Sequence, residues 1–170
     1  MGGSSPKRGG LGFSAGVEKY SFYRKGPTLL KNLSPLLSGA LLSALDSMKD
    51  GDLLTLVGSG YPEERIVSPV IHLGEVTTEA AADAILSVMS LDCHDPAPIA
   101  FLDLTNTYDD LPDVAFAVNG IASDAELRRV NMKRLELDEF VLLASSSVIT
   151  VRVGSNAPPC AFVLRKGECL

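Results

Sequence analysis

The chain of 170 residues lacks long hydrophobic runs, an excess of basic charge and a regular cysteine pattern. No stretch approaches the roughly 18 continuous apolar residues that a membrane-spanning helix needs, so we expect no membrane span. The formal net charge is −6 and the pI is near 4.9, which argues against duplex DNA or RNA as the main partner. Hydrophobic residues make up 46% of the chain, and a chain of this length can bury one core. These features are typical of a globular domain of ordinary composition.

The cysteines are few and irregularly placed. Cys93, Cys160 and Cys169 are an odd number and contain no C-x-x-C spacing, so we expect neither a disulfide framework nor a structural zinc site. Unpaired cysteines favour a reducing compartment. No apolar signal region precedes the body, and we expect an intracellular protein, cytoplasmic or mitochondrial and not secreted. Cys93-His94-Asp95 brings three metal-capable groups together, but without a second cluster we expect no metal.

The charge is unevenly distributed. Residues 1–26 contain five Lys and Arg residues against Glu18 alone, a net of +4, so the rest of the chain carries −10. We therefore expect a basic, glycine-rich arm over residues 1–27 and a domain over residues 28–170. A disordered tail is usually poor in aromatic residues, whereas this arm interleaves them with basic ones. Docking on another protein subunit is the interpretation we favour, with disorder and RNA contact as alternatives. The arm residues expected to bind a partner are Tyr20, Phe22, Tyr23, Arg24 and Lys25.

Helices alternate with strands along the body, which indicates a layered α/β domain. We expect Ser34 to cap a first helix that has Pro35 at its first position. A second helix is expected to begin at Thr77 or Thr78, and the capping-box pattern Ser123-Asp124-Ala125-Glu126 predicts a third. The other expected elements are a helix at 140–144 and strands at 53–57, 99–103, 115–118, 148–153 and 160–165.

Several short motifs are similar, in order and spacing, to the ribose pyranase and fucose mutarotase family. That family opens with L-x-x-x-S-P-x-x-S, a helix and then Gly-His-Gly-Asp. Here the corresponding segments are Leu30-Lys31-Asn32-Leu33-Ser34-Pro35-Leu36-Leu37-Ser38 and Met48-Lys49-Asp50-Gly51-Asp52, followed by Tyr61-Pro62, Arg134-Leu135-Glu136-Leu137 and Phe162-Val163-Leu164-Arg165-Lys166-Gly167. The resemblance implies a three-layer α/β/α fold around a central mixed sheet and a homo-oligomer. It also implies interconversion of the ring forms or anomers of a free monosaccharide, without a cofactor.

The polar site residues of the family are mostly replaced. Asp50 stands where the family has its catalytic His, while the Asp that closes that motif is kept as Asp52. Gly58 and Gly60 replace an Asp and a His or Asn, and His72 replaces an Arg. The family's sugar-contacting Tyr-Gly-Asn becomes Pro159-Cys160-Ala161. Scaffold motifs are kept while acid, base and sugar contacts are lost.

Three hypotheses follow from this pattern. The first is a catalytically degenerate, mutarotase-like protein that serves as a structural or interaction subunit. The alternative is an active mutarotase with a rebuilt acid/base site of Asp50 and Asp52, in which His72 and Tyr61 contact substrate. A third is binding of a sugar or nucleotide without turnover, at the loop 58–62. For the individual residues we favour the simpler interpretation, in which both carboxylates are solvated at a helix end and His72 is a structural histidine.

Overall fold

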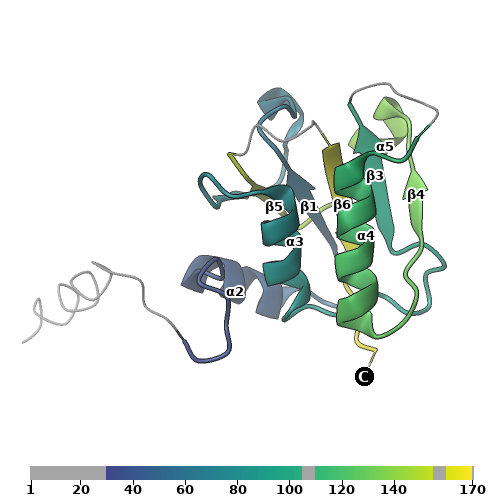
Figure 1. Ribbon diagram of the computed structural model, residues 1–170. Coiled ribbons are helices and arrows are strands. Elements are labelled where there is room, and N and C mark those ends of the chain that lie inside the picture. Colours follow the sequence, from purple (N-terminus) through teal and green to yellow (C-terminus); the bar gives the residue numbers. More distant parts are fainter. Residues whose placement is uncertain (1–29, 105–109, 155–159, 170) are drawn as a thin grey trace, which may run out of the picture. The chain divides into compact units, whose positions relative to one another are not determined.

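The computed structural model describes residues 30–104, 110–154 and 160–169. By compactness the chain separates into two units, residues 1–35 and 36–170. The arm residues from Tyr20 to Lys25 lie outside the described residues, and the predicted arm and its boundary at residue 27 stay predictions. Unit 36–170 is built on one six-stranded sheet with the strand order β2-β5-β1-β6-β3-β4 (Figure 1). The elements in chain order are α2 (Gly39–Ser47), β1 (Leu53–Val57), η1 (Glu63–Arg65), β2 (Val70–His72), α3 (Thr78–Leu86), β3 (Ile99–Asp103), α4 (Asp113–Glu126), β4 (Met132–Arg134), α5 (Leu137–Ala144), β5 (Ile149–Arg152) and β6 (Cys160–Arg165).

The sheet is mixed because one central strand runs against the others. β1 pairs in parallel with β5, β5 with β2, and β3 with β4. β6 lies between β1 and β3 and is antiparallel to both. Five strands therefore end at one edge of the sheet, which we call the carboxyl edge. β6 ends at the opposite, amino edge.

Helices cover both faces of the sheet, as a three-layer α/β/α fold requires. α3 and α4 pack side by side on one face, and α5 lies behind the sheet (Figure 1). Alternate residues along a strand point to opposite faces, and the set facing α5 forms one core cluster around Phe140. Every residue of β1 and of β3 is buried, as expected for strands covered on both faces. The strand residues of that cluster are Leu53, Val57, Ala100, Leu102, Ala161 and Val163.

Most predicted elements are present, but three local predictions are wrong. The first helix begins at Gly39 and is capped by Ser38, whose hydroxyl accepts the Leu41 N–H at 3.2 Å, so Ser34 is not its cap. The segment 115–118 is not a strand but belongs to α4. Ser123 does not open a helix; it lies in the last turns of α4 and its hydroxyl accepts the Val130 N–H.

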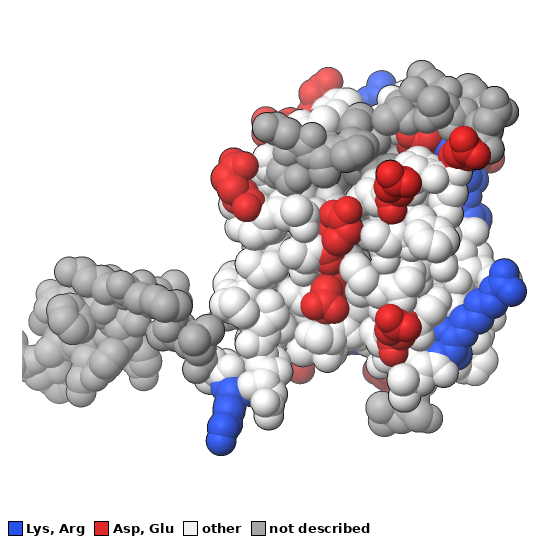
Figure 2. All heavy atoms as spheres, viewed as in Figure 1, with Lys and Arg blue, Asp and Glu red and all other residues white. Residues whose placement is uncertain are grey.

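Charge on the α3/α4 face is mainly negative. Figure 2 shows acidic side chains scattered over this face and basic ones near its margins. Asp83, Asp113 and Asp124 are exposed on these two helices. Within the described ranges, none of the helices is both long and apolar enough to cross a membrane.

Candidate functional site

The carboxyl edge is where this topology places a binding site. In open α/β sheets, ligands bind in crevices outside the carboxyl ends of the strands. At this edge a hollow of about 260 Å³ lies beyond β2 and β5. His72 and Arg152 are register partners at the ends of these two strands, and both line the hollow. The remaining lining residues are Glu63, Ile66 and Val70.

Arg152 is the basic residue of this hollow and contacts two neighbouring groups. Its Nη1 lies 3.1 Å from the Glu63 carboxylate, and its Nη2 donates to the Ser59 carbonyl at 3.4 Å. The loop after β1 is thereby tied to β5. The Arg152 side chain is only 15% exposed, whereas that of Glu63 is 74% exposed. The hollow thus offers a fixed cation and an accessible carboxylate.

His72 is exposed beside this pair. Among the described residues, its imidazole makes no hydrogen bond or ion pair. The exposed side chain can exchange hydrogen bonds with solvent or a ligand, and substrate binding by His72 stays a prediction.

Tyr61 lies in the core and does not line the hollow. The residue is 3% exposed and its ring meets Phe140 edge-to-face, with the centroids 5.9 Å apart. Its hydroxyl is buried without a hydrogen-bond partner among the described residues. Burial raises the pKa of the Tyr61 hydroxyl, and the nearby Arg65 charge opposes this shift. The geometry gives Tyr61 a packing role, and sugar contact by its hydroxyl stays a prediction.

Asp50 and Asp52 lie at the other end of the molecule, where β1 begins. The Asp52 carboxylate accepts the Lys49 N–H at 2.7 Å and so closes the turn between α2 and β1. Asp52 also lines a hollow of about 190 Å³ with Met48, Pro69, Val148 and Ile149. A five-residue strand spans about 16 Å, so one chain does not bring these carboxylates to His72. A site that uses Asp50 and His72 together needs a second copy of the chain.

A second hollow at the carboxyl edge contains an ion pair that the sequence analysis missed. Arg134 Nη2 lies 2.7 Å from the Asp103 carboxylate, and both residues line a cavity of about 150 Å³. The Asp103 side chain is only 4% exposed. The guanidinium also stacks over the Phe101 ring at 5.6 Å. The available signal was an aspartate that ends a buried apolar run, at the carboxyl end of a strand.

The prediction for the cysteines is wrong in one respect. Cys93 and Cys169 form a disulfide, although they are 76 residues apart. Sequence spacing gave no sign of this pair because the sheet topology alone brings the two segments together. His94 lies beside the disulfide, whereas Asp95 instead pairs with Arg165 at 2.9 Å. The metal-capable group is therefore Cys93, His94 and Cys169.

Comparison with protein families identifies the scaffold. A family model described as "RbsD / FucU transport protein family" matches residues 31–169. The chain belongs to this family. The match begins just after the arm, so the RbsD/FucU scaffold corresponds to the α/β body. No curated protein sequence matches the chain significantly.

Solved structures support the RbsD/FucU fold. Protein Atu2016, provisionally assigned as a sugar binding protein, is 27% identical, with a TM-score of 0.75 over 84% of this chain and 98% of that one. FucU from Bifidobacterium longum is 21% identical, with a TM-score of 0.74 over 82% of this chain and all of that one. The fucose mutarotase from Streptococcus pneumoniae, solved with L-fucose, is 23% identical, with a TM-score of 0.69 over 83% of this chain and all of that one. The last two likenesses establish the fold.

Proposed function

We propose that this RbsD/FucU-family protein binds a free monosaccharide in the hollow of Glu63, His72 and Arg152 without rapidly interconverting its anomers. Three kinds of polar group converge there: a guanidinium, a carboxylate and an exposed imidazole. These groups match the donors and acceptors of sugar hydroxyls. The hollow is slightly smaller than pockets for drug-sized ligands, which hold roughly 300–1,000 Å³. A monosaccharide is correspondingly smaller than such ligands.

The replacement of the family's polar site residues, with Asp50 in place of the catalytic His and Gly58 and Gly60 after the first strand, is the observation that carries the loss of turnover. Mutarotation needs a donor for the ring oxygen and a base for the anomeric hydroxyl within reach of one sugar. The residues at the family's acid/base positions are glycines or lie at the far end of β1. Among the described residues, the one carboxylate that lines the hollow, Glu63, is already engaged in an ion pair with Arg152.

Calorimetric titration of the full chain with fucose, ribose, galactose, glucose and a nucleotide tests the binding. We expect heat with at least one sugar, and an affinity about tenfold lower in His72→Ala, a loss of roughly 1.4 kcal/mol. Asp83→Asn, an exposed change on α3, is the matched control and should bind normally. No heat with any sugar, or heat with the nucleotide alone, would contradict sugar binding.

A working mutarotase with a rebuilt site is the second candidate. Glu63 and His72 line one hollow, so an acceptor and a group able to donate face the same ligand. Asp50 and Asp52 join this site only if a second chain supplies them. Anomer exchange that is faster with protein and lost in His72→Ala would establish this candidate; loss in Asp50→Ala would point to a site shared between copies.

The second part of the proposal is that the protein acts as an interaction subunit, whose N-terminal arm binds another protein. Residues 1–27 are rich in basic and aromatic residues, whereas the rest of the chain is acidic. These residues also lie outside the segment that matches the family model, residues 31–169. Cross-linking in cells through Lys19 and Lys25 tests this role. We expect links from the arm to a different protein, and links only within this chain would contradict it.

A further inference from the structure

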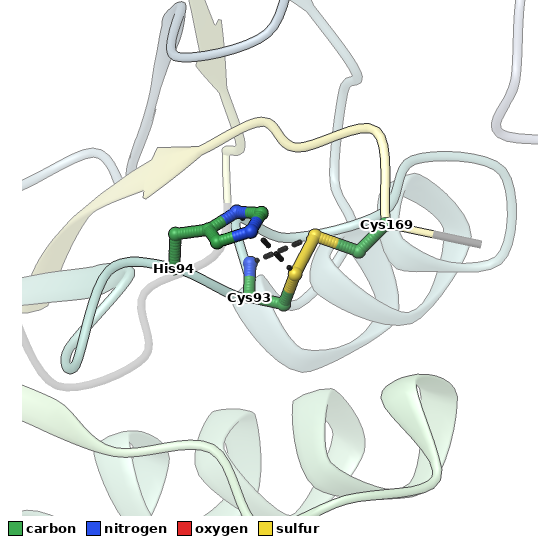
Figure 3. Close-up of side chains that lie close together, drawn as sticks. All are labelled: Cys93, His94 and Cys169. Atoms are coloured by element: carbon green, nitrogen blue, oxygen red, sulfur yellow. Dashed lines mark hydrogen bonds between the residues drawn. A yellow bond between two sulfur atoms is a disulfide. The ribbon is translucent and has the colours of Figure 1, made fainter.

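Two cysteines and a histidine gather at the amino edge, remote from the proposed sugar site. Cys93 and Cys169 are joined with their Cα atoms 6.1 Å apart. The His94 Nδ1 lies 3.6 Å from the Cys93 Sγ, and the three ligand atoms all lie within 4.8 Å of one another. Figure 3 shows the imidazole beside the sulfur pair. Cys93 and His94 are exposed, so the group is open to solvent.

Backbone pairing holds the two cysteine segments together independently of the disulfide. Leu91 and Lys166 form an antiparallel bridge. The Asp92 N–H donates to the Arg165 carbonyl at 3.0 Å, and the Gly167 N–H donates to the Ser90 carbonyl at 2.9 Å. A Cβ on Gly167 would collide with the Asp92 backbone, so the close approach requires glycine there.

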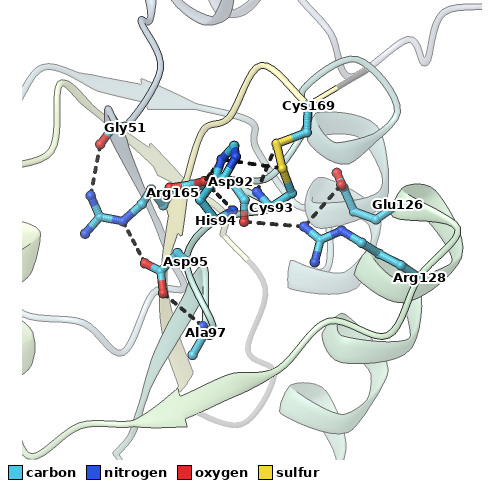
Figure 4. Close-up of polar contacts among 10 residues, drawn as sticks. All are labelled: Gly51, Asp92, Cys93, His94, Asp95, Ala97, Glu126, Arg128, Arg165 and Cys169. Carbon is cyan, nitrogen blue, oxygen red and sulfur yellow. Dashed lines mark hydrogen bonds and ion pairs between the residues drawn. A yellow bond between two sulfur atoms is a disulfide. The ribbon is translucent and has the colours of Figure 1, made fainter.

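Side chains on both flanks fix the same segment. Glu126 at the end of α4 accepts the Leu91 N–H at 2.7 Å and pairs with Arg128 at 3.5 Å. Arg128 in turn donates to the Asp92 carbonyl at 3.4 Å (Figure 4). On the other flank, Arg165 pairs with Asp95 at 2.9 Å and donates to the Gly51 carbonyl at 3.2 Å (Figure 4). Reduction of the disulfide therefore leaves two thiols facing each other beside an imidazole.

Two thiolates and an imidazole are ligands that zinc prefers. Zn–S bonds of about 2.3 Å and Zn–N bonds of about 2.0–2.1 Å place tetrahedral ligand atoms roughly 3.5–3.8 Å apart. The separation of Nδ1 from the Cys93 Sγ already has this value. After reduction the two sulfurs need only rotate apart, and Cys93 is exposed while Cys169 is half-buried. Three protein ligands leave a fourth position for water, as in open zinc sites.

We propose that Cys93, His94 and Cys169 form a redox-gated site that binds one Zn²⁺ ion when the cysteines are reduced and is closed when they are oxidised. The oxidant is a low-molecular-weight disulfide such as glutathione disulfide. One cysteine thiolate attacks it to give a mixed disulfide and one free thiolate. The second cysteine thiolate then attacks the mixed disulfide, which forms the Cys93–Cys169 disulfide and releases the remaining half of the oxidant as a thiolate. Two electrons pass from the cysteine pair to the oxidant, which leaves as two thiolates, and Zn²⁺ departs with its charge unchanged.

Cobalt titration of the reduced, metal-free full chain is the test, because Co²⁺ reports thiolate ligation by its absorption. We expect one Co²⁺ per chain with a thiolate-to-cobalt charge-transfer band, displaced by one equivalent of Zn²⁺. Cys160→Ser alters the third cysteine, which lies at the start of β6, and should leave the band intact. Cys169→Ser should lose most of the band, and His94→Gln should weaken binding about tenfold.

Oxidation supplies the second readout. Glutathione disulfide should abolish the band, release the metal and lower the free thiols from three per chain to one. Circular dichroism of each variant checks folding, and His94→Gln, whose side chain is 88% exposed in the native protein, provides a test if a cysteine variant fails to fold. Absence of the band in the reduced protein, its persistence in Cys169→Ser, or metal retained after disulfide formation would each overturn the proposal.

Discussion

The two edges of the sheet differ in how their segments are held together: the carboxyl edge has an open hollow, whereas the amino edge has a disulfide. At the carboxyl edge an exposed imidazole and an exposed carboxylate line an open hollow. At the amino edge the chain is cross-linked by a disulfide, a backbone bridge and paired ions. Lys166 adds to this by donating to the Leu45 and Met48 carbonyls at the end of α2. The difference teaches that the covalent cross-link lies at one end of the strands, whereas the groups proposed to bind a sugar lie at the other.

Loss of the disulfide should have the largest effect on stability. A cross-link closing a loop of 76 residues is expected to contribute roughly 4 kcal/mol by restricting the unfolded chain. Cys169→Ser should therefore unfold at lower urea concentration than the oxidised wild type. Reductant should bring the wild type to the stability of the variant and leave the variant itself unchanged. Equal stability of the oxidised wild type and the variant would contradict the amino edge as the stabilising end.

Gly167→Ala should be the next most damaging change. Its new methyl group would meet backbone atoms of Asp92, which cannot move aside as a side chain tip can, and we expect a cost of about 2–3 kcal/mol. Gly120→Ala is the matched control, because it lies within α4 and a Cβ there meets nothing within 4 Å. The control should stabilise by about 0.5–1 kcal/mol. Urea unfolding curves that rank the two variants the other way would show that the 165–169 segment is not packed as described.

At the carboxyl edge, changes should alter binding and leave folding nearly intact. Arg152→Gln removes the cation that holds Glu63 and the Ser59 carbonyl, and we expect sugar affinity to fall about tenfold, or roughly 1.4 kcal/mol. Calorimetry checks the affinity. Unchanged affinity in this variant would move the binding site away from the hollow.

Tyr61→Phe should have the smallest effect, and at neutral pH a neutral or slightly stabilising one of up to about 1 kcal/mol. The substitution deletes a buried hydroxyl that has no partner among the described residues. Because the pKa of folded Tyr61 lies above its unfolded value near 10, the folded state keeps a proton that the unfolded chain releases. The free energy of unfolding of the wild type should therefore fall as pH rises above about 10, and less so in Tyr61→Phe. A clear loss of sugar affinity in this variant would instead show that the hydroxyl contacts the ligand.

Local sequence signals predicted most of the scaffold. The apolar runs at β1 and β3 and the Thr77 cap of α3 were readable because burial and capping act on neighbouring residues. β2 and β4 were missed because each is three residues long and carries no buried alternation. α4 was misread because its short segment 115–118 is apolar, whereas its buried residues follow a helical spacing only over the longer stretch from Val114 to Ala122.

The candidate site was only partly predictable, since it depends on strand order. The family resemblance placed His72 at a ligand-binding position, and the hollow includes it. Arg152 was not anticipated because the parallel pairing of β2 with β5 brings it to His72, and Glu63 because its ion pair with Arg152 brings it there from η1. Cys93 and Cys169 were likewise joined by topology, and nothing in their spacing indicates it.

Two-dimensional proton exchange NMR of anomer interconversion tests the central claim most directly. Purified protein would be mixed with fucose, ribose, galactose or glucose, and the exchange rate compared with that of the sugar alone. Our account predicts no enhancement with any of the four, together with measurable binding of at least one. Enhanced exchange with any sugar would contradict it, and loss of that enhancement in Asp50→Ala or His72→Ala would show which end of the sheet performs the chemistry.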